Sequence, residues 1–500
     1  MSQSHRSYSK LTLDKDLEKI AKVELATQFM SRRLVGLGVA VAFLALALVF
    51  ASFFVGGLPG SVIIIAAAVV GAYMALNIGA NDVANNVGPA VGSNAMSMGV
   101  ALIIAAVFES SGALIAGGDV VGTISKGIID PNNFADSSIF VWAMMAALIS
   151  SALWVNLATW IGAPVSTTHS VVGGVMGAGI AAAGLATVNW PTMASIAASW
   201  VISPLIGGVI AAIFLALIKT LIIYQDDKIA AARRWVPVLI AIMAGAFATY
   251  LALKGIKKVI KIDIQTALII GAVVAVIAWA VLRPVIAIQA KGLANRNQSL
   301  RKLFAIPLVC SAALLSFAHG ANDVANAVGP LAAIVHTAGV GEIASKVAIP
   351  LWVMVIGAFG ISFGLLLFGP KLIRMVGQQI TKLNPMRAYC VALSAAITVI
   401  VASWLGLPVS STHIAVGAVF GVGFFREWYT GNSKRRRRYV NKQKSLSGTS
   451  QPVVNYSELR RRKLVRRSHF MTIIAAWVVT VPAAALLSAS VFLILSSIMG

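Results

Sequence analysis

Long apolar stretches separated by shorter polar stretches run through the whole chain. Because a helix needs about 20 apolar residues to cross a bilayer, eleven of these stretches are predicted to be membrane-spanning helices. They are 34–57, 61–80, 98–118, 138–162, 194–224, 235–253, 265–290, 303–319, 348–369, 386–406 and 469–498. Two further stretches, 164–185 and 408–425, are shorter or rich in glycine and hydroxyl residues, which indicates broken or re-entrant segments. Counting both as crossings, the pattern predicts an all-α polytopic membrane protein with about 12 core crossings and one extra N-terminal span.

The composition agrees with this class. The 500 residues are 59% hydrophobic and 11% charged, whereas soluble domains carry roughly 25% charged residues. The polar, mixed-charge residues 1–33 lack the apolar core of a cleavable signal peptide. Cys310 and Cys390 lie inside apolar stretches, where packing thiols are expected. A soluble protein is therefore excluded, and no disulfide or metal site is expected from the cysteines.

The formal net charge of +24 comes from residues placed between the apolar stretches. Cytoplasmic loops of membrane proteins are enriched in Lys and Arg. With a cytoplasmic N-terminus, 32 of the 40 Lys and Arg fall in cytoplasmic segments, and the lysine-rich loop 254–264 is the exception. The charges thus predict a multi-pass protein with a cytoplasmic N-terminus and no nucleic-acid partner, and the membrane is expected to be the inner (plasma) membrane. The densest basic run, 434–438, is expected to meet membrane lipid headgroups.

Two motifs occur twice. The phrase Gly-Ala-Asn-Asp-Val-Ala-Asn stands at 79–85 and, 241 residues later, at 320–326. A Pro-Val-Ser-Thr/Ser-Thr-His element at 164–169 returns at 408–413, at nearly the same spacing. The chain is therefore predicted to contain two homologous transporter repeats, which the topology makes inverted. The predicted divisions are a cytoplasmic segment 1–33, an anchor 34–57, a first repeat 61–224, a linker 225–302 with two transmembrane helices, and a second repeat 303–498 that includes a basic loop 426–468.

The acids within the apolar stretches define the candidate chemistry. A carboxylate in lipid is costly and usually marks a functional site. Asp82, Glu109 and Asp323 lie deep in the predicted spans, and no Lys or Arg lies deep enough to pair with them. Unpaired carboxylates are protonated or gather cations, so an anion is expected here only together with Na⁺ or H⁺. Glu109 has no counterpart in the second repeat, which leaves a cation or proton site and a helix–helix contact both open.

The same residues allow other interpretations. Glycine and proline in the phrases are expected to break the helices and free backbone groups. The histidines at 169 and 413 are expected to be structural donors, and those at 319 and 336 are weaker candidates still. A hydrolase using Ser166 or Ser410 is disfavoured, because triads are not usually duplicated and neither serine stands in a nucleophile-elbow pattern. We therefore expect a protein that is not an enzyme and holds no cofactor. A receptor that senses the same anion without carrying it would differ from a transporter only in flux.

With its doubled phrases and hydroxyl motifs, the chain resembles the inorganic phosphate transporter family over about 61–498. The resemblance implies an importer of inorganic phosphate that uses alternating access and the coupling ion Na⁺ or H⁺, with a homodimer as the family's expected assembly. It implies phosphate binding by Asp82, Ser166, Thr167, Thr168, Asp323, Ser410, Ser411 and Thr412. It implies cation binding by Asn81, Asp82, Asn85, Asn322, Asp323 and Asn326, with Na⁺ at the four asparagines. Glu109 is a further cation-binding candidate because it lies deep in a predicted span.

Alternatives within transport remain open. Some members of the resembled family carry a neutral metal–phosphate complex with H⁺, and a few relatives carry sulfate. The phrase begins Gly-Ala-Asn-Asp in this chain, which is more similar to the phrase of the sodium-coupled members. Phosphate can donate a hydrogen bond to Asp82 or Asp323 and sulfate cannot, so a competition assay distinguishes the two anions.

Overall fold

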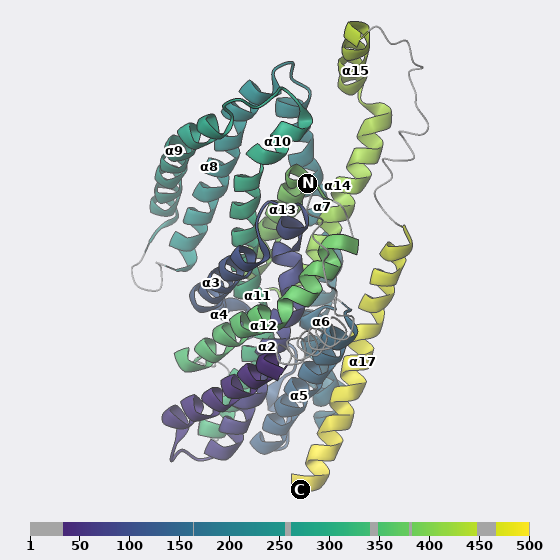
Figure 1. Ribbon diagram of the computed structural model, residues 1–500. Coiled ribbons are helices and arrows are strands. Elements are labelled where there is room, and N and C mark those ends of the chain that lie inside the picture. Colours follow the sequence, from purple (N-terminus) through teal and green to yellow (C-terminus); the bar gives the residue numbers. More distant parts are fainter. Residues whose placement is uncertain are drawn as a thin grey trace, which may run out of the picture.

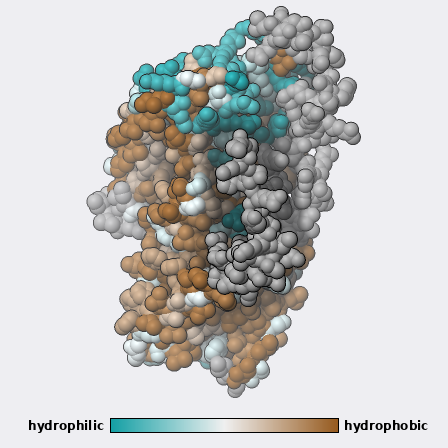
Figure 2. All heavy atoms as spheres, in the orientation of Figure 1, coloured by the Kyte–Doolittle hydropathy of each residue, from teal (hydrophilic) through white to brown (hydrophobic). Residues whose placement is uncertain are grey.

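The computed structural model describes residues 34–163, 165–255, 262–340, 349–379, 383–447 and 467–499, and in these ranges every regular element is a helix. The predicted N-terminal segment 1–33 and residues 448–466 of the predicted basic loop lie outside the described residues. Eleven described helices are long and apolar enough to cross a membrane, and they correspond to the eleven predicted spans. Figure 2 shows apolar side chains over most of the visible face and hydrophilic ones gathered at one end. The prediction of an all-α polytopic membrane protein is confirmed.

A helix over Leu34–Val55 precedes the first repeat. The main helices in the range predicted as the first repeat are α2 (Ser61–Gly92), α3 (Met98–Ala116), α4 (Gly118–Gly122), α5 (Ser137–Ile161), α6 (Thr167–Ala183) and α7 (Trp190–Ile218). The linker forms α8 (Lys228–Lys254), α9 (Ile264–Gln289) and α10 (Asn297–Leu303). The second repeat forms α11 (Ala305–Val340), α12 (Leu351–Gln379), α13 (Pro385–Trp404), α14 (Ser411–Asn432), α15 (Lys434–Ser447) and α17 (Arg467–Met499) (Figure 1).

Helices of one repeat pack mainly against helices of the other. Helix α2 packs along α12, and its counterpart α11 packs along α3. Likewise α6 packs along α17, while its counterpart α14 packs along α7. Each of these contacts thus has a counterpart in which the equivalent helices of the two repeats are exchanged. The two repeats complete one another, and residues from both are brought to the centre of the molecule.

The first glycine of each phrase allows a close helix crossing. A Cβ on Gly79 of α2 would lie 1.9 Å from the Ile361 carbonyl oxygen of α12. A Cβ on Gly320 of α11 would lie 2.0 Å from the Glu109 carbonyl oxygen of α3. Small residues at such crossings let the backbones approach and pack directly. These glycines therefore position the acids that follow them in the phrases.

The change Gly320→Ala is expected to be strongly destabilising. Its methyl group would meet backbone atoms, so α11 and α3 would have to separate, at a cost of about 3 kcal/mol or more. A matched control is Gly99→Ala on α3, where an added Cβ meets nothing within 4 Å. Thermal unfolding of the purified proteins should show a large loss for the first variant and none for the second. Equal unfolding temperatures would contradict this account of the crossing.

Both phrases lie inside continuous helices, so the expected helix breaks within them are wrong. Helix α2 continues past the predicted end at 80 to Gly92, and α11 continues past 319 to Val340. The polar side chains of the phrases form tertiary hydrogen bonds, and each proline is accommodated within its helix. The chain is instead interrupted before α6 and α14. These two helices are the stretches predicted to be broken or re-entrant, and whether they cross the bilayer stays a prediction.

Candidate functional site

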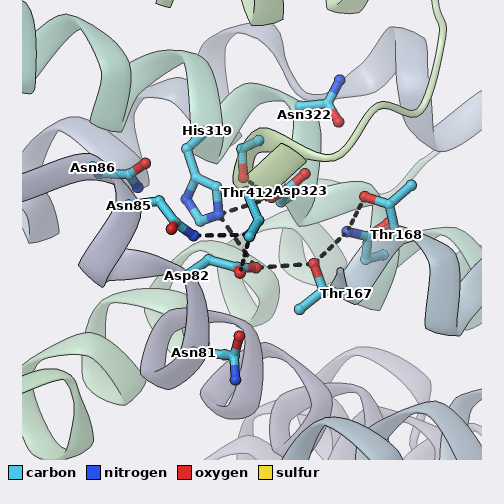
Figure 3. A network of polar contacts seen from close by, with 12 residues as sticks. Asn81, Asp82, Asn85, Asn86, Thr167, Thr168, His319, Asn322, Asp323 and Thr412 are labelled. Carbon is cyan, nitrogen blue, oxygen red and sulfur yellow. Dashed lines mark hydrogen bonds and ion pairs between the residues drawn. The ribbon is translucent and has the colours of Figure 1, made fainter. Parts of the chain in front are cut away.

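Two aspartates from different repeats meet at the centre of the molecule. Asp82 on α2 and Asp323 on α11 are both 1% exposed. Together with His319, also on α11, they offer ligand atoms that all lie within 4.8 Å of one another. Figure 3 shows the three side chains converging between the helices. The crossings of α2 with α12 and of α11 with α3 thus place two buried carboxylates and one imidazole in a single cluster.

His319 bridges the acids of this cluster. Its Nε2 lies 2.8 Å from Asp323 Oδ2 and 3.7 Å from Asp82 Oδ2. On the other side of the ring, Nδ1 lies 3.2 Å from Glu109 Oε2, and Asn86 Nδ2 donates to Glu109 Oε1 at 2.8 Å. The interpretation of these carboxylates as lacking any basic neighbour is therefore wrong. One imidazole still supplies at most one positive charge against three carboxylates.

Equivalent hydroxyls of the two repeats donate to equivalent acids. Thr167 Oγ1, at the start of α6, donates to Asp82 Oδ2 at 2.9 Å. Ser411 Oγ, at the start of α14, donates to Asp323 Oδ2 at 3.0 Å. Within each repeat, the hydroxyl motif therefore lies directly against the aspartate of that repeat's phrase.

A second set of hydrogen bonds joins the repeats to each other. Thr412 Oγ1 donates to Asp82 Oδ1 at 3.1 Å and accepts from Asn85 Nδ2 at 2.8 Å. In the opposite direction, Asn326 Nδ2 lies 3.3 Å from Thr167 Oγ1 and 3.2 Å from Thr168 Oγ1. The phrase of each repeat is thus bonded to the hydroxyl motif of the other (Figure 3).

Asn81 and Asn322 hold the chain that leads into α6 and α14. Asn81 Oδ1 accepts from the Val165 amide at 3.3 Å, and its Nδ2 donates to Thr159 Oγ1 at 2.9 Å. Asn322 does the same with the Val409 amide, at 3.3 Å, and with Ser403 Oγ, at 2.9 Å. In Figure 3, Asn322 lies above the cluster and Asn81 lies below it. These contacts hold the loops before α6 and α14 in place, and Na⁺ binding by the two asparagines stays a prediction.

Ser166 and Ser410 are the N-caps of α6 and α14. The Ser166 Oγ accepts from the His169 amide at 3.1 Å, and the Ser410 Oγ accepts from the His413 amide at 3.3 Å. The two helix N-termini therefore begin beside the acids, with residues 167, 168, 411 and 412 in their first turns. An α-helix N-terminus carries partial positive charge and amides without intrahelical acceptors. The rings of the two histidines contact each other, with centroids 4.4 Å apart.

Several oxygens at the centre are suited to a cation. Asp323 Oδ1 and Asn326 Oδ1 are buried and accept no hydrogen bond from the described residues. Proline has no N–H, so Pro89 in α2 and Pro330 in α11 cannot donate the usual helical hydrogen bond to the carbonyl four residues earlier. The carbonyls at those positions, 85 and 326, belong to the last asparagine of each phrase. Carboxylate, amide and carbonyl oxygens are the donors that hard cations prefer.

The sequence profile of the phosphate transporter family matches residues 78–488. The chain belongs to that family. A relative in Helicobacter pylori strain 26695 named as a phosphate permease is 46% identical over 530 aligned positions, which cover 97% of this chain and 99% of the relative. A phosphate permease from Pyrococcus abyssi is 36% identical, over 85% of this chain and 96% of its own. A solved structure, that of a sodium-dependent phosphate transporter, superposes with a TM-score of 0.77 at 33% identity, and the match covers 88% of this chain and 100% of its own.

In this member of the phosphate transporter family, the structure brings most of the predicted site residues into one network. They are Asp82, Asn85, Thr167, Thr168, Asp323, Asn326, Ser411 and Thr412. Ser166 and Ser410 lie at the helix caps, and Glu109 lies behind His319. Sequence patterns alone undervalue His319 and give Asn86 no role. The i, i+4 spacing of His319 and Asp323 on one helix was the available signal.

Proposed function

We propose that the protein is a secondary active symporter that imports inorganic phosphate together with Na⁺. The observation that carries the proposal is the hydroxyl network on the two buried acids: Thr167 and Ser411 each donate to the aspartate of their own repeat, and Thr412 donates across to Asp82. The family and the names of its relatives support phosphate as the substrate. The similarity to the solved sodium-dependent phosphate transporter supports Na⁺ as the coupling ion.

The hydroxyl donors link cation binding to anion binding. Each hydroxyl has a single proton to donate, and in this structure Thr167, Ser411 and Thr412 donate theirs to carboxylates. A cation on those carboxylates would take over the acceptor lone pairs. The hydroxyl protons would then be free to turn toward phosphate oxygens. Cation binding and phosphate binding would therefore favour each other.

The helix N-termini supply further donors for the anion. The first-turn amides of α6 and α14 face the region between the repeats, and aligned peptide dipoles favour an anion there. Two such ends from opposite repeats would hold a tetrahedral anion on two sides. The N-caps Ser166 and Ser410 would keep both ends rigid. Preorganised donors reduce the ordering cost of binding.

The charges require the cation. With all groups ionised, three carboxylates and one imidazolium carry a net charge of −2, and phosphate would add to it. Burying an uncompensated charge costs several kcal/mol. We propose that Na⁺ uses Asp82, Asp323, Asn85 and Asn326, including the oxygens of Asp323 and Asn326 that accept no hydrogen bond from described residues. Asn81 and Asn322 would position the loops.

The repeats suggest how the site is exposed to each side. The reciprocal packing of α2 with α12 and α11 with α3 is what a pair of inverted repeats would produce. We propose that rocking of these packed units gives alternating access. The hydrophilic end seen in Figure 2 would face the cytoplasm, and the membrane would be the inner (plasma) membrane.

Uptake into proteoliposomes tests the proposed function. Purified protein is reconstituted, and labelled phosphate uptake is measured with an inward Na⁺ gradient, an inward H⁺ gradient, or neither. We expect concentrative uptake with the Na⁺ gradient alone. Uptake driven only by H⁺, and only when a divalent metal is present, would support metal–phosphate transport instead. Absence of uptake in every condition would contradict the proposal.

Sulfate competition tests the choice of anion. The centre contains carboxylate acceptors as well as donors, and a protonated phosphate can donate to an acceptor whereas sulfate cannot. Discrimination against an analogue that lacks a matching hydrogen bond can be large. Sulfate at equal concentration is therefore expected to leave phosphate uptake nearly unchanged. Strong inhibition would favour a sulfate permease.

A further inference from the structure

A groove lined by three arginines lies between α8 and α9, outside the two repeats. Its volume is about 520 Å³. The lining residues are Ala230, Arg233, Arg234 and Val238 of α8, and Trp279, Arg283 and Ala287 of α9. Positions three and four apart share one face of a helix, so each helix contributes a single face. Among the lining residues, Ala230 lies nearest the start of α8 and Ala287 nearest the end of α9.

The groove is located where lipid headgroups lie. Arg233 is five residues after the start of α8, and Arg283 is six residues before the end of α9. At 1.5 Å of rise per residue, both lie about 8–9 Å from the helix ends. Figure 2 shows hydrophilic side chains at this end of the molecule and apolar ones beyond them. The positive charges are therefore at the edge of the apolar band.

The same helix faces continue as apolar surface. Ile242, one turn beyond Val238, is 62% exposed, and Val276, three residues before Trp279, is 65% exposed. Helix α9 as a whole faces outward, with only 11% of its apolar window buried. The groove thus has charged groups at one end and an apolar track at the other, which fits an amphipathic ligand better than a small ion.

The two acids just before α8 are engaged with other partners. Asp227 caps α8 by accepting from the Ile229 and Ala230 amides, and Asp226 pairs with Lys442 at 2.8 Å. No acid is among the described lining residues. The Arg283 guanidinium lies over the Trp279 ring, 5.2 Å from its centroid, which orients it toward the groove. Stacked arginines are suited to bidentate contacts with phosphate.

We propose that this groove binds the phosphate headgroup of an anionic phospholipid, with the acyl chains lying along α8 and α9. Basic pockets between transmembrane helices bind such headgroups, and tryptophan is enriched at this depth. A volume of this size fits a headgroup, since sites for drug-sized ligands have about 300–1,000 Å³. The site is separate from the phosphate centre, to which α8 and α9 contribute no side chain of the network described above.

Native mass spectrometry of the purified full-length protein, titrated with phosphatidylglycerol, tests the proposal. The variant Arg233→Gln/Arg234→Gln/Arg283→Gln removes the groove's charge. The matched variant Arg435→Gln/Arg437→Gln/Arg438→Gln removes the same charge from α15. At about 1 kcal/mol for each basic residue held in the groove, we expect roughly hundredfold weaker binding in the groove variant and a clearly smaller loss in the α15 variant, whose basic run is expected to attract headgroups without a groove to hold them. Equal weakening in both variants, or none in either, would overturn the proposal.

Three further arms identify the ligand. Phosphatidylcholine should bind far more weakly than phosphatidylglycerol, and neither glycerophosphoglycerol nor inorganic phosphate should displace the bound lipid. Displacement by inorganic phosphate at equal concentration would assign the groove to the free ion and overturn the lipid site. If the triple variant does not elute as a single species, Arg283→Gln alone should weaken binding about fivefold. Unchanged binding in that variant would also contradict the proposal.

Discussion

Replacing Asp323 by asparagine is expected to abolish phosphate uptake. The amide would remove one negative charge from a cluster in which Asp323 lies 2.8 Å from His319 Nε2 and accepts from Ser411. It would also remove the carboxylate that we propose as a cation ligand. Breaking a buried charged pair costs about 3–5 kcal/mol, which corresponds to at least a hundredfold loss of binding. Asp82→Asn should have the same effect, because Asp82 accepts from both Thr167 and Thr412.

A carboxylate-to-amide change elsewhere provides the control. Asp136 is exposed and caps α5 by accepting from the Ser138 amide. Asparagine caps helices about as well as aspartate, so Asp136→Asn should transport phosphate normally. Initial uptake rates, divided by the amount of protein in the membrane, are the measurement. Normal uptake by either Asp323→Asn or Asp82→Asn would remove both residues from the proposed site.

Replacing His319 by glutamine is expected to destabilise the protein and to stop transport. The imidazole is the basic group between Glu109 and the two aspartates, and it is fully buried. Without it, three carboxylates would face one another with no described basic side chain among them. The expected loss is about 3–5 kcal/mol, measured by thermal unfolding in detergent. His336→Gln changes a histidine on the same helix that has no described acidic partner, and it should have little effect.

A double-mutant cycle separates the pairing of His319 with Glu109 from a simple packing role. Removing Glu109 as well, in His319→Gln/Glu109→Gln, should recover part of the lost stability because one of the repelling charges is gone. Residues in one charged network usually show coupling of about 0.5–3 kcal/mol. Losses that simply add would mean that His319 fills space without pairing with Glu109. Recovery of stability without recovery of uptake would assign His319 to the charge balance of the transport site.

Local sequence signals predicted the helices and the pairing of the motifs well. Spans of suitable length fix the fold class, and the doubled phrases indicated that Asp82 and Asp323 belong to one centre. The course of the helices through the phrases was not predictable from propensity alone. The predicted role of Asn81 and Asn322 is cation binding, and the sequence gives no sign that they bond to the backbone before α6 and α14, as they do in the structure. Those contacts join residues more than 80 positions apart, so local pattern does not indicate them.

The charge balance of the centre shows a second limit. Counting lysine and arginine alone misses a histidine one turn before Asp323. The role of Glu109 depends on the close crossing of α3 and α11 at Gly320, which brings it to the far side of the same imidazole. Because Glu109 has no equivalent acid in the second repeat, comparing the two repeats does not single it out. Only the tertiary arrangement connects Asn86, Glu109 and His319 with the two aspartates.

Equilibrium binding of labelled phosphate to the purified protein, with Na⁺ or with choline at equal ionic strength, tests the central claim most directly. If the anion is held only together with a cation, Na⁺ should tighten phosphate binding. By linkage, phosphate should tighten Na⁺ binding by the same factor. Asp323→Asn should remove this mutual effect. Equal phosphate affinity in Na⁺ and in choline would contradict the claim that the buried acids make the two ions bind together.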